Sequence, residues 1–218
     1  IAVPSAPVLV DLKKDPAHRA AVEGCDFAIT DSGFMVLLWL LLKQEKLPRI
    51  SGLRYLRALL QRPELKNAGA TFWVMPSAPD AAANRAWLQT QHFAVSDADT
   101  YLAPLYPAGE LADHALLAQI EARRPRYVFL NLGGGVQERL GYFLRKNLSY
   151  RPASSCTGAA IAFLSGRQAV LPVWADRLMP GWLIRTLQSP GRFLPRYWRA
   201  TQLAVLLVRH GEKSVAAP

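Results

Sequence analysis

Two short stretches of the chain combine residue types that could bind an anionic ligand and activate a hydroxyl group. The segment GGGVQERL, residues 133–140, places three glycines between an apolar run and a helix-like stretch. Glycines let backbone amides approach a ligand closely, and the start of a helix favours an anion. The segment ITDSG, residues 29–33, places Asp31 at the end of another apolar run. A carboxylate there could act as a general base toward a sugar hydroxyl.

The glycine segment matches neither of two common phosphate-binding motifs. A Walker loop requires Gly-Lys-Ser/Thr, which is absent, and the spacing of Gly133, Gly135 and Glu138 does not fit the dinucleotide fingerprint. Gln137 and Glu138 fall in the first turn of the expected helix, where a carboxylate gains from the helix dipole. The motif alone leaves open a purely structural interpretation, a tight turn capped by Glu138.

Asp31 also has a structural alternative. Asp31 or Ser32 can cap the helix that is expected to continue through GFMVLLWLLL, residues 33–42. This run is the longest apolar stretch of the chain, but it is too short to span a bilayer, which takes about 20 residues. We therefore expect a buried helix.

A third candidate site lies in the basic, aromatic C-terminal part of the chain. Arg185, Arg192 and Arg196 are spaced by seven and four residues, so a helix would bring them to one face. Pro190 and Pro195 make that face approximate. Guanidinium groups bind phosphate and diphosphate through paired hydrogen bonds, and the interleaved aromatic residues suit a membrane interface. The alternative is a solvated charged face.

The order of the expected elements indicates how these residues are positioned. Apolar runs at 7–12, 26–30, 70–75, 92–97 and 126–132 are expected to be strands. Helix-like stretches follow at 13–25, 33–42, 53–60, 79–91, 110–124 and 137–147, and 154–166 reads as a strand or turn leading into a short helix. This alternation predicts an α/β fold with a Rossmann-like, mostly parallel sheet and helices on both faces. Ligands of such sheets bind at the carboxyl ends of the strands.

Composition suits one globular core with a basic extension. The chain has 218 residues, 51% of them hydrophobic, and a net charge of +10. We expect a core over 1–166 and a basic, helical, membrane-associating appendage over 167–218. Two cysteines do not make a disulfide framework, which favours a reducing, cytoplasmic setting. The start resembles the middle of a domain, so the expectation includes residues upstream of Ile1.

Five stretches together resemble the WecG/TagA/CpsF glycosyltransferase family, also called glycosyltransferase family 26. The segments that carry the resemblance are DLKKDPAHRAAVEGCDFAITDSG, LPRISGLRYLRALL, RRPRYVFLNLGGGVQE, TGAAIAFLSGR and LPVWADRLMPGWLIRTLQSPGRFLPRY. The last two are the more specific, because their spacing matches the family pattern from Gly166 to Tyr197.

The resemblance implies an inverting transfer of an N-acetylhexosamine-type sugar. The donor would be a UDP-sugar and the acceptor a polyprenyl-diphosphate-linked sugar, in bacterial cell-surface polysaccharide synthesis. The enzyme would need no metal or other cofactor. It would be cytoplasmic and peripheral, on the inner face of the cell membrane, in contact with an anionic membrane surface. Self-association is also among the expected interactions.

The resemblance also assigns roles to individual residues. Asp31 matches the proposed catalytic base. The residues that match the nucleotide-sugar pocket are Thr30, Gly133, Gly134, Gly135, Gln137, Glu138 and Gly158. Arg185, Arg192 and Arg196 match the arginines that hold the lipid diphosphate. The glycine turn would present its amides and Gln137 to the UDP-sugar, and Glu138 would brace the turn.

Two other classes of function remain open at this point. Because several donor-side positions depart from the family pattern, one is a non-catalytic nucleotide-binding or scaffold relative. The other is a nucleic-acid binder, which net charge alone suggests and which should bind in a strongly salt-dependent way. Since charge is its only support, no nucleic-acid partner is expected.

Overall fold

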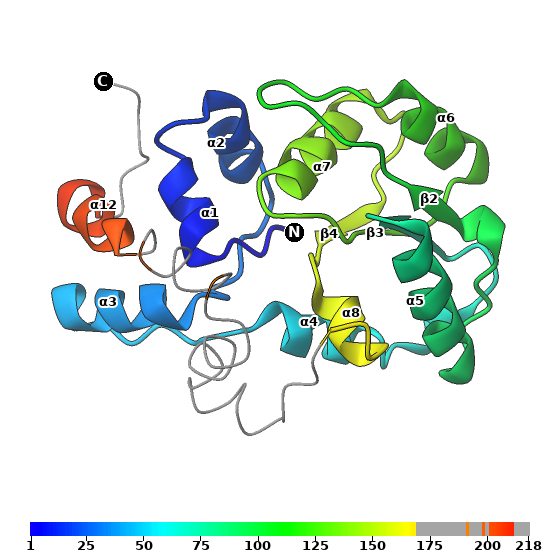
Figure 1. Cartoon of the computed structure of the whole chain (residues 1–218), viewed down its shortest axis with the longest axis horizontal. Helices are drawn as coiled ribbons and strands as arrows, with labels where there is room; N and C mark the ends of the chain where they lie inside the picture. The colour runs from blue at the N-terminus through cyan, green and yellow to red at the C-terminus, as the bar shows by residue number, and fades with distance from the viewer. Residues whose placement is uncertain (169–190, 192–197, 199–200, 212–218) are drawn as a thin grey trace.

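The computed structural model describes residues 1–168, 191, 198 and 201–211 (Figure 1). Within them lies a four-stranded sheet in the order β2-β1-β3-β4, in which every neighbouring pair is parallel. The strands are β1 (Thr71–Met75), β2 (Thr100–Leu102), β3 (Tyr127–Leu130) and β4 (Ala153–Cys156). The predicted α/β fold with a parallel sheet is confirmed.

Helices cover both faces of this sheet, because the side chains of each strand alternate between two apolar clusters. Phe72 and Val74 of β1 pack toward α6 (His114–Arg123) and α7 (Val136–Asn147). Trp73 and Met75 pack on the opposite face, which carries α4 (Gly52–Leu59), α5 (Ala78–Thr90) and α8 (Ala160–Leu164). The Trp73 ring stacks on Phe129 of β3 with centroids 4.1 Å apart. We call β1–β4 with α4–α8 the sheet body.

Four further helices form a second region, which we call the helical flank (Figure 1). They are α1 (Ala6–Asp11), α2 (Pro16–Glu23), α3 (Gly33–Lys43) and α12 (Gln202–His210). Residues of α1, α3 and α12 share a small apolar cluster of their own, and α2 packs against α7 of the body. The flank therefore joins the body beside α7 and β4.

The strand predicted at 7–12 is wrong, because residues 7–11 belong to α1 and Leu12 is its C-cap. Ser5 precedes the helix in an extended conformation and Pro7 lies in its first turn, an arrangement that favours the start of a helix. A short apolar run fits a buried helix as well as a buried strand, and its pattern does not distinguish the two. Here Ala6, Val8 and Val10 are buried as parts of a helix.

The strand predicted at 26–30 reduces to a single bridge. Ala28 pairs in parallel with Ala2, through hydrogen bonds from the Ala2 amide to Phe27 O (2.8 Å) and from the Ile29 amide to Ala2 O (3.0 Å). Ile1 in turn lies along β4, because the Cys156 amide donates to Ile1 O at 3.0 Å. These two segments therefore extend the sheet beyond β4.

The strand predicted at 92–97 is also misplaced. Phe93 and Val95 are buried in the sheet body, but they belong to a connecting segment and β2 begins only at Thr100. A 3-10 helix (Asp97–Asp99) intervenes, and the Asp99 carboxylate accepts from the Ser96 amide at 2.9 Å. This local capping ends the apolar run before a strand can form.

The helix predicted over 33–42 is confirmed, but its predicted burial is wrong. Ser32 caps α3 by accepting from the Met35 amide at 3.1 Å, yet no residue of α3 is buried. Only one side of the helix, including Met35 and Leu38, packs on α1 and α12. Because nearly every residue of 33–42 is apolar, the sequence does not indicate which side of the helix packs against a neighbour.

Among the described residues, no helix has the length and apolar character needed to cross a membrane. Much of the predicted appendage falls outside the described residues, and the described segment 201–211 contains α12. The division into 1–166 and 167–218 stays a prediction.

Candidate active site

The glycine turn joins β3 to α7, and each of its three glycines has a different reason to be there. Gly133 is exposed, and a Cβ on it would meet nothing within 4 Å. A Cβ on Gly134 would overlap Cγ2 of Val8, so this glycine allows α1 to approach the turn. Gly135 has φ of +89°, a conformation that side chains disfavour. The turn thus combines an open position, a packed one and a left-handed one.

Glu138 and Gln137 hold the turn from within. Glu138 Oε2 accepts from the Gly135 amide at 2.6 Å, and its Oε1 accepts from Gln137 Nε2 at 3.0 Å. Gln137 Oε1 accepts from the amide of Gly158, which follows β4, at 2.8 Å. Both side chains are 3% exposed. The bracing role expected of Glu138 is confirmed, and Gln137 links the turns that follow two neighbouring strands.

Two residues that sequence analysis missed complete this edge of the sheet. Asn131 directly follows β3 and donates from Nδ2 to Val74 O at 3.3 Å, while its Oδ1 accepts from Thr157 Oγ1 at 2.9 Å. Both side chains are buried. A polar residue directly after a buried strand was the available signal, since such residues gather at the carboxyl edge of a parallel sheet.

Arg139 is a further missed residue, and it connects the turn to the segment that follows β2. Its Nε donates to Gly135 O at 3.0 Å, and its Nη1 donates to Pro107 O at 3.2 Å and to Gly109 O. The glycine pattern in the sequence gives no sign that Arg139, which directly follows Glu138, is buried. Its effect is to fix the outer side of the turn.

Asp31 follows the Ala28 bridge and lies at the start of α4. Its Oδ1 accepts from the Gly52 amide at 2.9 Å, and its carbonyl accepts from Arg49 Nε at 3.2 Å. Ser32 caps α3, so the alternative that Asp31 caps this helix is wrong. The preceding Thr30 donates its hydroxyl to Pro48 O, which fixes the same loop.

The parallel order places Asp31 and the glycine turn at the same edge of the sheet but not in contact. The sequence of neighbours is β3, β4, the Ile1–Ala2 segment and the Ala28 bridge. Three spacings of about 4.8 Å put the two features roughly 14 Å apart across the sheet. The N-terminal segment links them, because Val3 lies beside Gly52 and Val8 lies against Gly134.

His18 of α2 was not predicted and lies behind the turn. It is 2% exposed, and its Nε2 has no hydrogen-bond partner among the described residues. Its ring approaches the position that a Cβ would take on Gly135, with Nδ1 at 3.8 Å. Burial lowers the pKa of His18, and the nearby Glu138 carboxylate opposes that shift. Burial against the turn therefore favours the neutral form of the imidazole over the charged form.

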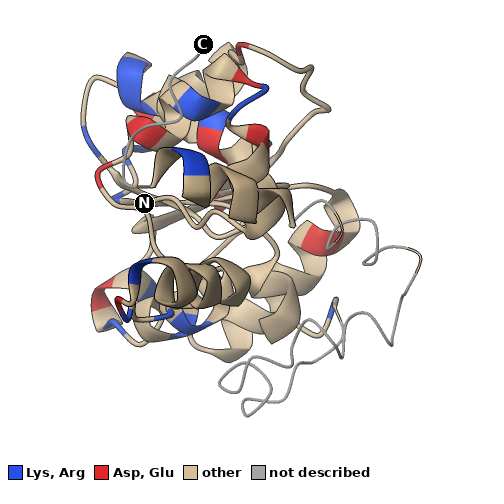
Figure 2. Ribbon diagram, turned by 90° about the vertical axis from the view of Figure 1, so that its left-hand side faces the viewer, with Lys and Arg blue, Asp and Glu red and all other residues tan. Residues whose placement is uncertain are grey.

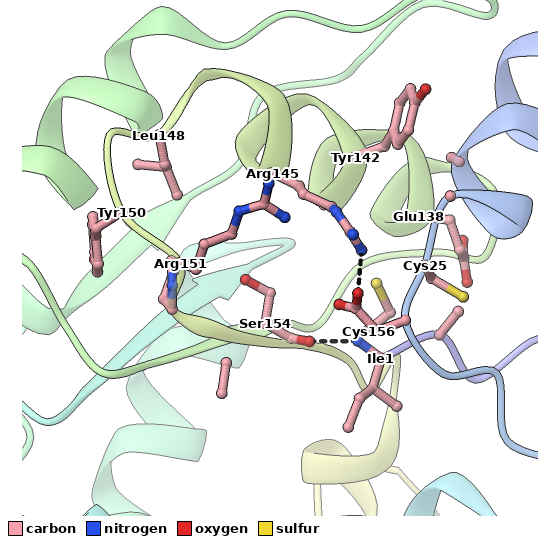
Figure 3. A pocket seen from close by; sticks show the side chains of 17 residues that line it. Ile1, Cys25, Glu138, Tyr142, Arg145, Leu148, Tyr150, Arg151, Ser154 and Cys156 are labelled. Carbon is pink, nitrogen blue, oxygen red and sulfur yellow. Dashed lines mark hydrogen bonds and ion pairs between the residues drawn. The ribbon is translucent and has the colours of Figure 1, made fainter.

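A cavity of about 290 Å³ lies between α7, the start of β4 and the segment after α2 (Figure 3). Gly141, Tyr142 and Arg145 line it from α7, and residues 151–154 line it from the start of β4. Arg145 forms an ion pair with Asp26 at 2.8 Å. Of the predicted site residues that the structure describes, only Glu138 borders this cavity, so the cavity is distinct from the candidate site.

Both cysteines also border this cavity and both are free thiols. Burial raises the pKa of the Cys156 thiol, which is the behaviour of a structural cysteine. In the part of the chain that the structure describes, no cluster of His, Cys, Asp and Glu could hold a metal ion. The arginines predicted to bind a lipid diphosphate, Arg185, Arg192 and Arg196, lie outside the described residues.

The chain as a whole matches one family model, Glycosyl transferase WecG/TagA/CpsF family, over residues 1–215. None of the curated proteins compared with the chain matches it. The family match implies a sugar donor and an acceptor, and a role in cell-surface polysaccharide synthesis. Because the match covers nearly the full length, the chain belongs to the WecG/TagA/CpsF family of glycosyltransferases, as its sequence motifs indicated.

Proposed function

We propose that this glycosyltransferase moves an N-acetylhexosamine-type sugar from a UDP-sugar to a polyprenyl-diphosphate-linked acceptor, with inversion, at the inner face of the cell membrane. The observation that carries the proposal is the shared edge of the parallel sheet. An exposed glycine turn at a helix start and a carboxylate held by a backbone amide both lie there. Inverting transfer needs these two functions, a site for the leaving diphosphate and a base.

The leaving UDP would bind at the open part of the turn. Gly133 and Gly134 are exposed, and no acceptor among the described residues takes a hydrogen bond from either amide. These amides and the positive end of α7 would offset the charge that develops on the diphosphate. Gln137 and Glu138 are buried and bonded to the turns, so we assign them to positioning rather than to direct contact.

Asp31 would remove the proton from the acceptor hydroxyl. The Gly52 amide holds one carboxylate oxygen at the N-terminus of α4 and so orients the side chain. Arg49 binds the Asp31 carbonyl and lies beside the same site. Across a separation of about 14 Å between base and turn, the transferred sugar and the acceptor hydroxyl would lie between them.

A donor screen tests this proposal. The purified chain is incubated with UDP-N-acetylhexosamines and a short polyprenyl-diphosphate-linked sugar, and the product is measured by mass spectrometry. UDP alone should raise the melting temperature, since a ligand at 100 times its Kd adds about 2.7 kcal/mol of apparent stability. Stabilisation by UDP without product would support the non-catalytic relative instead, and no response to UDP would reject the donor assignment.

A further inference from the structure

We propose that the outer side of α3 and α12 is a membrane-contact surface that lies in the interface of an anionic bilayer. This inference rests on the proposed function and assigns its membrane contact to particular residues. We call the surface the outer apolar face. Its members are Phe34, Leu37, Leu40 and Leu41 of α3 and Val205 and Val208 of α12.

The spacing of these residues shows that they form one side of each helix. In α3, Phe34, Leu37 and Leu41 follow a three-then-four spacing, whereas Met35 and Leu38 point to the cluster with α1. In α12, Val205 and Val208 lie opposite the buried Leu203 and Leu206. Among the described residues, the packing of the flank comes from the inner sides of these helices, and the side chains on the outer sides are exposed.

The exposure of this face is large for a globular protein. Leu41 and Val208 are each 68% exposed, and α3 has no buried residue at all. Large apolar side chains exposed to this extent on two neighbouring helices indicate an interaction site. Figure 2 turns the end of the molecule that carries α3 and α12 toward the viewer, with Lys and Arg in blue and Asp and Glu in red.

The positive charges beside the outer apolar face favour an anionic partner. Lys43 ends α3, Lys46 follows it, and Arg209 lies in the last turn of α12. Lys43 Nζ lies beside Gly211, so the cationic ends of the two helices meet. Neither helix contains an acidic residue, and the one acid within 33–50 is Glu45, which accepts from Trp39 Nε1 at 3.1 Å.

An anionic leaflet fits this arrangement better than a second copy of the chain does. Two copies joined through this face would bring their lysines and arginines together, whereas acidic lipid headgroups attract these cations. The 11 residues of α3 span roughly 16 Å, about half the hydrocarbon thickness. The helix would therefore lie in the plane of the interface.

The position of α3 gives this contact a role in the reaction. Ser32 caps the helix and Asp31 directly precedes it. A bilayer that receives the outer apolar face would hold the candidate base near the headgroups, where the diphosphate of a lipid-linked acceptor lies.

Labelling with an environment-sensitive fluorophore tests the contact directly. The full chain carries Cys25→Ser and Leu41→Cys, and a matched control carries Cys25→Ser and Ala86→Cys on the exposed surface of α5. With vesicles of phosphatidylglycerol and phosphatidylcholine, we expect a blue shift at position 41 and none at position 86. Equal responses at both positions would overturn the proposal. So would a label at 41 that is already shielded without vesicles, by the chain itself or by a second copy at higher concentration.

Co-sedimentation with vesicles measures how strongly the chain binds the membrane. We expect Leu37→Gln with Leu41→Gln to weaken vesicle partitioning at least about tenfold, and Lys43→Glu with Lys46→Glu to remove the preference for phosphatidylglycerol. Unchanged partitioning of the leucine variant would refute the assignment. The leucine variant should keep its activity on a short water-soluble acceptor and lose it on a vesicle-embedded one. If no variant shows transfer with any acceptor, the proposed function fails while the partitioning result still decides the membrane contact.

Discussion

The sheet body and the helical flank are stabilised in different ways. In the body, strands bury both faces, and Phe72, Trp73 and Phe129 are at most 1% exposed. In the flank, α3 buries none of its residues. The candidate chemistry belongs to neither region alone, because Val8 and His18 of the flank pack on the glycine turn of the body. The sheet body therefore carries the glycine turn, whereas the helical flank packs against this turn. Asp31, the candidate base, lies in the segment between α2 and α3 of the flank.

The largest effect should come from the carboxylate at the junction. Asp31→Asn should lower kcat/KM by about 100- to 10,000-fold, the range expected for loss of a general base. Folding should be retained, since the asparagine oxygen can still accept from the Gly52 amide. Initial rates and thermal melting measure the two effects.

Asp26→Asn is the matched control, since this acid lies on the same segment and pairs with Arg145. Its activity should stay within about twofold, as expected for an exposed ion pair of small net energy. If Asp31→Asn turns over substrate as fast as this control, Asp31 has no part in the reaction and the flank supplies only packing.

The next largest effect should come from loss of the hydrogen bonds by which Glu138 braces the glycine turn of the sheet body. Glu138→Ala removes the acceptor of the Gly135 amide and of Gln137 Nε2. Leaving buried donors unsatisfied costs about 1–3 kcal/mol each, so we expect a loss of about 2–4 kcal/mol in urea unfolding. Glu138→Gln keeps one acceptor oxygen and should lose less. Equal stability of all three proteins would show that the turn is held by the flank instead.

The body was the easier region to predict, for a physical reason. Strands that are buried on both faces, such as 70–75 and 126–132, are continuous apolar runs bounded by polar or glycine residues. The glycine turn and the bracing by Glu138 follow from local rules for helix starts. Both were therefore visible in the sequence and agree with the structure.

The flank was harder, because its structure depends on neighbours that the sequence does not name. Residues 7–12 are apolar enough for a strand, yet Pro7 starts a helix there. The uniform run at 33–42 gave no sign of which side would be exposed. Arg139 and His18 act through contacts with the segment after β2 and with the turn, and such long-range contacts have no local signature.

A third experiment measures how strongly the two regions are coupled. Gly134→Ala places a methyl group where Val8 Cγ2 now lies, and overpacking of this kind costs about 1–3 kcal/mol. Val8→Ala makes room, so the double variant should recover part of the loss, with a coupling energy of about 0.5–3 kcal/mol in urea unfolding.

Gly133→Ala is the control for this cycle, because a Cβ there meets nothing within 4 Å. Its stability should stay within about 0.5 kcal/mol, while a methyl group at the open position should weaken UDP binding. Strict additivity of Gly134→Ala and Val8→Ala would mean that α1 does not rest on the turn, and the flank would lose its influence on the site.

The smallest effect concerns pH and the histidine behind the turn. Burial lowers the pKa of His18 in the folded chain, and Glu138, Asp15 and Asp11 oppose that shift while Arg139 adds to it. In the unfolded chain the imidazole binds a proton below about pH 6.5. The unfolded state therefore binds more protons between that pH and the lowered pKa of the folded state. The contribution of His18 to the free energy of unfolding is complete above about pH 6.5 and falls as the pH drops through this window.

Urea unfolding of the wild type and of His18→Met at several pH values should show a shallower fall for the variant. The other histidines are common to both proteins, so an identical fall in both would mean that the flank holds the turn without any dependence on the charge of His18.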